Sequence, residues 1–183
     1  MCSSDLPTLL VTGGSLGALH VNESMTGAAN ALPEGVQVVH LTGRGKDEPV
    51  RDAVRSAGLT ERWHVIDYLT TMEDALAVAD LVVCRSGAGT VAEMEALGLP
   101  CIYVPLPIGN GEQRLNAADH VASGGAQLID DKDFTADFVC RNVFPLLGST
   151  RLANMAASQS LGRAGAARAL ADLALEQVQE GGA

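Results

Sequence analysis

The chain is 183 residues long, 47% of its residues are hydrophobic, and its formal net charge is −10 at pH 7. This length and composition predict one compact globular domain covering residues 1–183, and they are not typical of a disordered chain. The negative charge disfavours nucleic acid and anionic membrane as main partners, so an anionic ligand would have to be held by local backbone dipoles.

The lack of a long apolar run and of a signal peptide predicts a cytosolic protein. No run of about 18 apolar residues occurs, and the first ten residues lack the charged and apolar regions of a signal peptide. We expect residues 1–6 to be disordered and residues 180–183 to fray.

The cysteines and histidines give no sign of a metal site. Cys2, Cys84, Cys101 and Cys140 show no C-x-x-C spacing, and two of them lie in apolar runs, which indicates buried thiols in a reducing compartment. The four histidines are scattered along the chain. The sequence therefore predicts neither a metal nor a cofactor.

Apolar runs alternate with helical patterns along the chain. The expected strands cover residues 8–12, 36–42, 63–68, 81–85, 101–106 and 126–129. The expected helices cover residues 21–31, 49–57, 72–79, 90–97 and 112–122, with further helices after the last strand. Continuous apolar strands that alternate with helices predict a doubly wound, six-stranded parallel α/β sheet of Rossmann-like type. Its strand-to-helix loops meet at the carboxyl edge, where ligands bind in such folds.

The first of these loops, "GGSLG" from Gly13 to Gly17, follows a strand and opens a helix. Free N–H groups at a helix N-terminus suit a diphosphate, but glycines also permit a tight turn and close packing of helix on strand. A strict G-x-G-x-x-G would need glycine where Thr12 stands, and no G-x-x-x-x-G-K-[ST] occurs. A nicotinamide dinucleotide and a P-loop nucleotide site are therefore disfavoured.

The loop after the fourth strand leads to a helix that we expect to begin at Thr90. The T-x-x-E spacing to Glu93 is that of a capping box, in which the glutamate reaches back to the helix start. Alternatively, the carboxylate points outward and accepts both hydroxyls of a ribose. The run of small residues ahead of the helix, from Ser86 to Gly89, favours a ligand.

The loop after the fifth strand, residues 109–113, carries carboxylate and amide groups at another helix start. Such groups suit sugar hydroxyls because each donates or accepts in a fixed plane. A plain N-terminal cap is the other interpretation, and the spacing does not decide between them.

Three stretches together resemble the MurG family, the N-acetylglucosaminyltransferases that convert lipid I to lipid II. They are "VTGGSLGA", "MEDALAVADLVVCRSGAGTVAEMEALGLP" and "VPLPIGNGEQRLNA", in the order and spacing of the family. The resemblance covers nearly the whole chain and implies the carboxyl-terminal, donor-binding half of a two-domain GT-B glycosyltransferase.

The resemblance also implies a role for each part of the site. The diphosphate would lie against Gly14, Ser15, Leu16 and Gly17 and against the small residues Ser86, Gly87 and Gly89, close to Thr90. Glu93 would hold the ribose, and Tyr68, Leu69 and Met72 would hold uracil, with the backbone of Leu69 reading the base. Glu112, Gln113 and Asn116 would face N-acetylglucosamine.

Two positions depart from the usual pattern of the family. Leu16 stands where the family usually has glutamine, and Glu112 stands where many relatives carry a second glutamine. The first departure puts a polar contact to the phosphates or the sugar in doubt. Because of both departures, the identity of the sugar is less firmly implied than the uridine part.

The resemblance finally implies a partner. Family members carry an amino-terminal domain with the acceptor pocket and the general base, so this chain would supply no catalytic base of its own. It would bind UDP-N-acetylglucosamine and meet lipid I, at the cytoplasmic membrane face, only through that absent acceptor domain or subunit. Two alternatives remain open: the donor half of another GT-B glycosyltransferase, and a catalytically silent nucleotide-sugar binding module.

Overall fold

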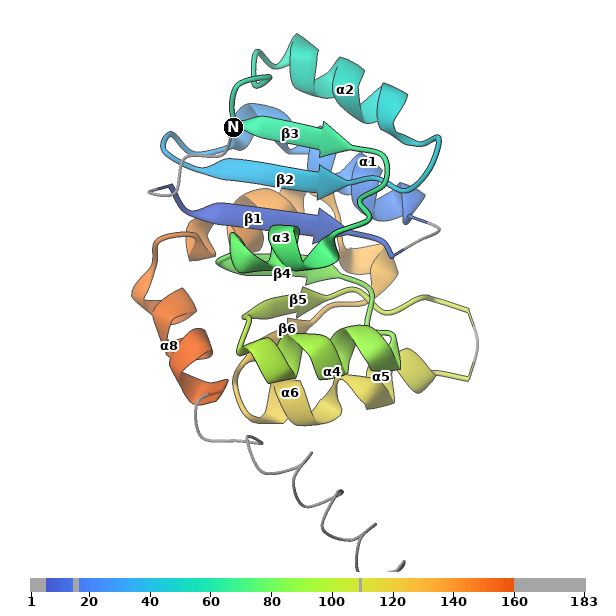
Figure 1. Ribbon diagram of the computed structural model, residues 1–183, viewed down its shortest axis with the longest axis vertical. Coiled ribbons are helices and arrows are strands. Elements are labelled where there is room, and N and C mark those ends of the chain that lie inside the picture. The colour runs from blue at the N-terminus through green and yellow to red at the C-terminus, as the bar shows by residue number, and fades with distance from the viewer. Residues whose placement is uncertain (1–5, 15–16, 109, 160–183) are drawn as a thin grey trace, which may run out of the picture.

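The computed structural model describes residues 6–14, 17–108 and 110–159. Its centre is a six-stranded sheet in the order β3-β2-β1-β4-β5-β6, with all neighbouring strands parallel (Figure 1). The strands are β1 (Thr8–Thr12), β2 (Gln37–Leu41), β3 (Trp63–Ile66), β4 (Leu81–Cys84), β5 (Cys101–Tyr103) and β6 (Ala126–Leu128). The predicted doubly wound parallel fold is confirmed.

Helices cover both faces of the sheet. One face carries α3 (Met72–Ala77), α4 (Ala88–Leu97), α5 (Glu112–Asn116) and α6 (Ala118–Ala122), which lie in front of the strands in Figure 1. The opposite layer holds α1 (Leu19–Gly27), α2 (Asp47–Ser56), α7 (Ala136–Phe138) and α8 (Thr150–Gln159). Short helical turns complete the described chain: η1 (Ala29–Ala31), η2 (Asp131–Asp133), η3 (Val139–Val143) and η4 (Phe144–Leu146).

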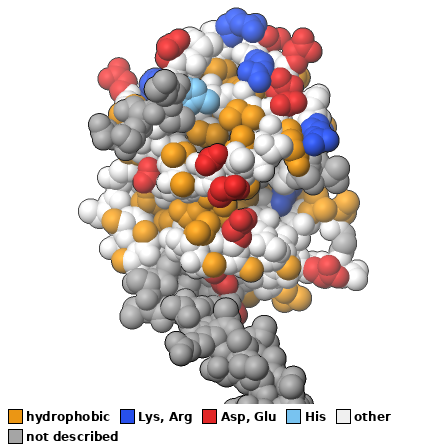
Figure 2. All heavy atoms as spheres, viewed as in Figure 1, with side chains coloured by type: hydrophobic (Ala, Val, Ile, Leu, Met, Phe, Trp, Pro, Cys, Tyr) orange, Lys and Arg blue, Asp and Glu red, His pale blue; other side chains and the backbone are white. Residues whose placement is uncertain are grey.

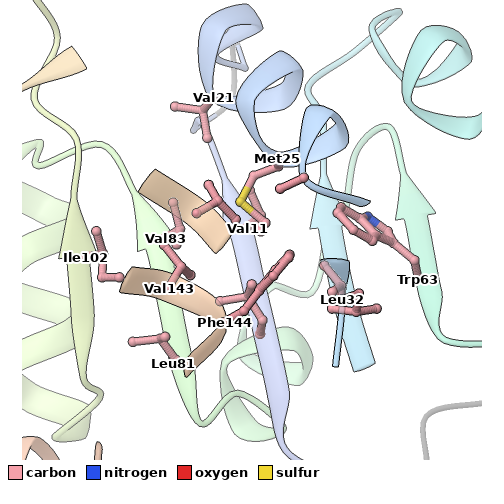
Figure 3. Close-up of a cluster of buried hydrophobic side chains, with 14 of the residues drawn as sticks. Val11, Val21, Met25, Leu32, Trp63, Leu81, Val83, Ile102, Val143 and Phe144 are labelled. Carbon is pink, nitrogen blue, oxygen red and sulfur yellow. The ribbon is translucent and has the colours of Figure 1, made fainter. Parts of the chain in front are cut away.

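Alternate residues of each central strand feed two separate cores, because successive side chains of a strand point to opposite faces. In β1, Leu9 and Val11 pack into the layer of α1, whereas Leu10 packs against α3 and α4. Figure 3 shows the larger core, in which Met25 and Trp63 lie beside the central strands. All five residues of β1 are buried, as expected for a strand covered on both faces.

A buried polar chain crosses this larger core. The indole N–H of Trp63 donates to Nδ1 of His40 at 3.3 Å, and Nε2 of His40 lies 3.0 Å from Oδ1 of Asn22. The amide of Asn22 then donates to the carbonyl oxygen of Thr42 at 3.1 Å. The imidazole is therefore neutral, with its proton on Nε2, and burial lowers the pKa of His40 from 6.5 to about 3.

The element boundaries show where sequence patterns were less informative. The first predicted strand matches β1 at both ends, whereas the other five predicted strands end one to three residues too late. Helix α1 begins two residues earlier than expected. Helix α2 begins at Asp47 because Pro49 is tolerated within a first helical turn. The single helix expected over residues 112–122 is divided at Ala117, which ends α5 and precedes α6.

The ends of the chain lie mostly beyond the described residues. Residues 1–5 and the tail at 180–183 are outside them, as are Ser15 and Leu16 of the first loop. Leu6 is described, and its carbonyl oxygen accepts a hydrogen bond from the Thr8 hydroxyl at 3.0 Å. In the part of the chain that is described, no helix has the length and hydropathy to span a bilayer.

Candidate functional site

A cavity of about 260 Å³ opens at the carboxyl edge of the sheet, on the right in Figure 1. It lies beside the switch point of the topology, where the chain passes from β3 on one side of β1 to β4 on the other. Its lining comes from the ends of four strands and the helices α3 and α4: Thr12, Gly14, Leu41, Gly43, Asp67, Tyr68, Leu69, Met72, Cys84, Arg85, Thr90, Glu93 and Met94. Six of the predicted binding residues are among them.

The glycine loop after β1 combines the two interpretations that its sequence allowed. Gly17 has a φ of +67°, and a Cβ there would lie 2.2 Å from the carbonyl oxygen of Thr42. A Cβ on Gly13 would lie 2.2 Å from the backbone nitrogen of Ala18. These two glycines serve close packing, whereas Gly14, with a φ of +78°, meets nothing within 4 Å and lines the cavity. The position open to a ligand is therefore Gly14.

Helix α4 presents a bare N-terminus to the same edge. Its N-cap is Gly87, no side chain caps the first turn, and that turn contains no acidic residue. A Cβ on Gly89 would meet nothing within 4 Å, so packing does not require glycine there. The free N–H groups and the positive end of the helix dipole suit an anion.

Ser86, directly ahead of this helix, adds a second sign of a ligand. Its side chain is fully buried, and its hydroxyl has no hydrogen-bond partner among the described residues. A buried hydroxyl without a partner lowers the stability of a fold by on the order of 1–3 kcal/mol. Such a group beside a bare helix end is typical of a binding site for a polar ligand.

The helix start expected at Thr90 is wrong, and with it the capping box, which was one of the two interpretations of Glu93. Helix α4 begins at Ala88, two residues before Thr90, because the small residues taken for loop belong to its first turn. Thr90 is therefore inside the helix, and Glu93 lies in the second turn, too far along to cap the start. Both residues line the cavity.

The loop after β3 forms another wall of the cavity. Tyr68 is 40% exposed, and the Arg44 guanidinium carbon lies 3.9 Å from the centroid of its ring. Leu69 and Met72 are partly buried against the core beneath α3 and α4. The side chains of Tyr68, Leu69 and Met72 make this wall largely apolar, and Asp67 lines the cavity beside them.

Arg85 is a site residue that the sequence analysis did not select. It follows β4 and lines the cavity, and its NH1 group donates to the carbonyl oxygens of Val104 (3.0 Å) and Pro105 (3.1 Å). The same group donates to Oδ1 of Asp131 at 2.5 Å, while Oδ2 of Asp131 lies 3.2 Å from Nδ1 of His20. A cation after a buried strand at the carboxyl edge is the signal that would have found it.

The residues predicted for the sugar lie beside the cavity without lining it. Oε1 of Gln113 accepts from the backbone N–H of Leu106 at 2.9 Å, and Nδ2 of Asn116 donates to the carbonyl oxygen of Ser86 at 3.1 Å. Glu112 is exposed in the first turn of α5. The contact from Asn116 to Ser86 brings the loops after β4 and β5 together.

The thiols and acidic groups do not form a metal centre among the described residues, where no cluster of three or more His, Cys, Asp or Glu side chains is placed to hold an ion. Cys84 and Cys101 are buried and free, as predicted, whereas Cys140 is only partly buried and Cys2 lies outside the described residues. The neighbouring thiol of Cys101 and burial raise the pKa of Cys84. Cys84 is therefore an uncharged part of the cavity floor.

Curated proteins with similar sequences match nearly the whole of this chain. The curated UDP-N-acetylglucosamine--N-acetylmuramyl-(pentapeptide) pyrophosphoryl-undecaprenol N-acetylglucosamine transferase of Paenarthrobacter aurescens is 46% identical over 175 residues, which is 94% of this chain and 46% of the relative. The protein of the same name from Mycolicibacterium smegmatis is 48% identical over 177 residues, 95% of this chain and 45% of the relative. The chain thus spans about half the length of these curated relatives.

Solved structures agree with the sequence match. The crystal structure of Acinetobacter baumannii MurG superposes with a TM-score of 0.81 at 26% identity, covering 94% of this chain and 53% of that protein. A calicheamicin glycosyltransferase shares the fold, with a TM-score of 0.68 at 18% identity over 99% of this chain and 46% of that protein. Residues 8–174 match the Glycosyltransferase family 28 C-terminal domain. The chain therefore belongs to glycosyltransferase family 28, of which it contains the carboxyl-terminal domain.

Proposed function

We propose that this chain is the donor-binding half of an inverting N-acetylglucosaminyltransferase that moves N-acetylglucosamine from its UDP donor to lipid I, forming lipid II. The observation that carries the proposal is the cavity at the carboxyl edge, which joins a bare helix N-terminus, an open glycine and an apolar wall. These three features match the diphosphate and the base of a UDP-sugar, and the names of the relatives supply the sugar and the acceptor.

The diphosphate belongs between the loops after β1 and β4. Gly14 lets the backbone approach a phosphate, and the free N–H groups at Gly87 to Thr90 meet it from the other side. Ser86 directly precedes this helix and its hydroxyl has no partner among the described residues, and Arg85 lines the same cavity. Ser15, Leu16 and Gly17 complete the predicted phosphate loop. The positive end of the α4 dipole and its free N–H groups stabilise the charge that develops on departing UDP.

The uridine part belongs to the other half of the cavity. The Glu93 carboxylate has two oxygens that accept both ribose hydroxyls, and it lines the cavity one helical turn from Thr90. Uracil lies against Tyr68, above Met72, and the backbone of Leu69 reads its edge. This assignment puts the base on the apolar wall and the phosphates on the helix end, which suits the chemistry of both.

The sugar belongs toward α5, on the far side of the Ser86 loop. Gln113 and Asn116 each use one side-chain atom to brace a loop, which leaves Nε2 of Gln113 and Oδ1 of Asn116 for sugar hydroxyls. Glu112 offers a carboxylate at the same helix start. Discrimination between sugars then depends on these three residues.

The acceptor half is a separate domain or subunit, which supplies the general base, the lipid I pocket and the peripheral contact with the cytoplasmic membrane face. Support comes from the length of the relatives and from apolar side chains on the segment after β5. Leu106 is 40% exposed, and Ile108 and Leu115 are each 73% exposed. Large exposed apolar side chains that gather on one segment mark a contact surface.

Calorimetric titration of the purified chain with UDP-N-acetylglucosamine, UDP-glucose, UDP and NADH tests the proposal. Tighter binding of UDP-N-acetylglucosamine than of UDP-glucose, and no binding of NADH, is the expected result. Equal binding of both sugars would indicate the donor half of a different GT-B enzyme. Binding of the donor without transfer, even after an acceptor half of a relative is added, would indicate a silent nucleotide-sugar module.

A further inference from the structure

The loop between β2 and α2 provides a contact that the proposed site does not yet use. Arg44 lies in this loop between Gly43 and Gly45, whose φ angles are +89° and +71°. Its guanidinium carbon is 3.9 Å from the ring centroid of Tyr68, the residue that forms the outer part of the apolar wall. Gly43 and Tyr68 line the cavity, whereas Arg44 does not. The guanidinium therefore covers Tyr68 from outside the cavity.

The charge of Arg44 is directed to this ring rather than to a carboxylate. Four other exposed arginines of the described chain, Arg51, Arg55, Arg114 and Arg141, form ion pairs with aspartates. Among the described residues, no carboxylate lies within ion-pair distance of Arg44. A guanidinium on an aromatic face contributes about 0.5–1 kcal/mol at an exposed site, and more once it is desolvated.

The backbone under Arg44 is well anchored. A Cβ on Gly17 would lie 3.1 Å from Cα of Gly43, so the glycine loop packs directly on the start of the Arg44 loop. The N–H of Thr42 donates to the carbonyl oxygen of Ile66 at 3.0 Å, which ties the ends of β2 and β3 together. Arg44 and Tyr68 thus extend from two loops whose bases are joined.

Tyr68 itself needs such support. Its ring is 40% exposed and stands at the mouth of the cavity, while its backbone N–H donates to Oδ1 of Asp67 at 2.7 Å. Free rotation about χ1 would carry the ring away from the cavity. A planar cation stacked on one face restricts that rotation and leaves the rest of the ring to a ligand.

We propose that Arg44 is a positioning residue for the nucleobase: it holds the Tyr68 ring in place, so that the ring presents a fixed aromatic wall to a planar pyrimidine. This inference rests on the proposed function, because it takes the base to lie at Tyr68. Arg44 acts through the ring and makes no contact with the phosphates.

The test compares ligands that share the base and differ in phosphates. Uridine, UMP and UDP are titrated into the wild-type chain and into Arg44→Ala, with uridine measured by competition against UDP. The expected loss is about two- to fivefold and equal for all three ligands, the fold-change that corresponds to about 0.5–1 kcal/mol. A loss of affinity that grows with the number of phosphates would mean that Arg44 binds the anion directly. An unchanged affinity would mean that the contact between Arg44 and Tyr68 does not contribute to binding. Either result overturns the inference.

Two further variants separate positioning from charge and from folding. Arg51→Ala removes the same charge from an exposed arginine of α2 that pairs with Asp47, and it should leave all three affinities unchanged. In a Tyr68→Leu background, Arg44→Ala should cause no additional loss, because the ring it supports is gone. Additive losses would contradict the inference. If the wild-type chain binds none of the three ligands, the proposed function itself fails, which is a separate outcome.

Discussion

At the scale of residues, the fold excludes one of the two interpretations of Glu93. Because α4 begins at Ala88, the carboxylate cannot cap the helix, and it lines the cavity instead. We expect Glu93→Ala to weaken UDP binding by about 1.5–3 kcal/mol, roughly ten- to a hundredfold, as for a lost charge-assisted hydrogen bond. Its melting temperature should stay close to that of the wild type.

Calorimetry and thermal unfolding of the same samples check this expectation. Glu23→Ala is the matched control, because Glu23 is an exposed glutamate of α1 that does not line the cavity. Unchanged affinity together with a lower melting temperature in Glu93→Ala would show that the glutamate is structural after all.

The buried histidine His40 makes the stability of the folded chain depend on pH. Burial keeps it neutral in the folded chain down to about pH 3, whereas in the unfolded chain it takes up a proton below about 6.5. The unfolded state therefore binds more protons between these values, and stability falls as the pH is lowered through this window. At pH 5 the loss from this group is about 2 kcal/mol relative to pH 8.

Urea unfolding, followed by fluorescence of the single tryptophan Trp63, measures this loss. His40→Gln should be less stable at pH 8, because it disturbs the contacts to Trp63 and Asn22, but it should lose less stability on going to pH 5. An equally steep acid dependence in the variant would assign the effect to other groups.

At the scale of elements, the N-terminus of α4 carries a group that lowers the stability of the free chain and is expected to favour ligand binding. The unpartnered Ser86 hydroxyl costs stability in the free chain, and a phosphate would satisfy it. Ser86→Ala should therefore raise the free energy of unfolding by about 1 kcal/mol while weakening UDP binding. Denaturant titrations with and without UDP measure both effects, and a variant that loses stability would show that the hydroxyl already has a partner.

The elements also show how far sequence patterns reach. The buried strands were predictable because five apolar runs begin at the residue where the strand begins. The start of α4 was not, because "GAGT" suits a loop and a first helical turn equally well, and only packing selects between them. The contacts of Arg85 with Asp131 and of Arg44 with Tyr68 join residues far apart in the chain, so local patterns carry no signal for them.

At the scale of the whole molecule, the net charge of −10 opposes an anionic ligand until it reaches the cavity. Figure 2 shows basic side chains mainly at the top of this face, over α2, among acidic ones. We expect the association rate constant of UDP to rise about twofold or more between roughly 0.01 M and 0.15 M salt, as the Debye length shortens from about 30 Å to about 8 Å. Stopped-flow measurements check this, with uncharged uridine as control. A rate that falls with salt would reveal a steering field of positive sign.

The division of the core by the sheet has a consequence for how the protein can change. Leu9 and Val11 face one layer and Leu10 faces the other, so substitutions in the layer of α1 and α8 are separated by the strands from the cavity over α3 and α4. Substitutions that change the thermal stability can therefore accumulate, or be engineered, in the layer of α1 and α8 while the cavity keeps its shape. Two sets of contacts cross this division. The Trp63 to Thr42 chain of hydrogen bonds ends at a carbonyl oxygen packed against Gly17 of the glycine loop, and Asp131 contacts both His20 of α1 and the cavity residue Arg85.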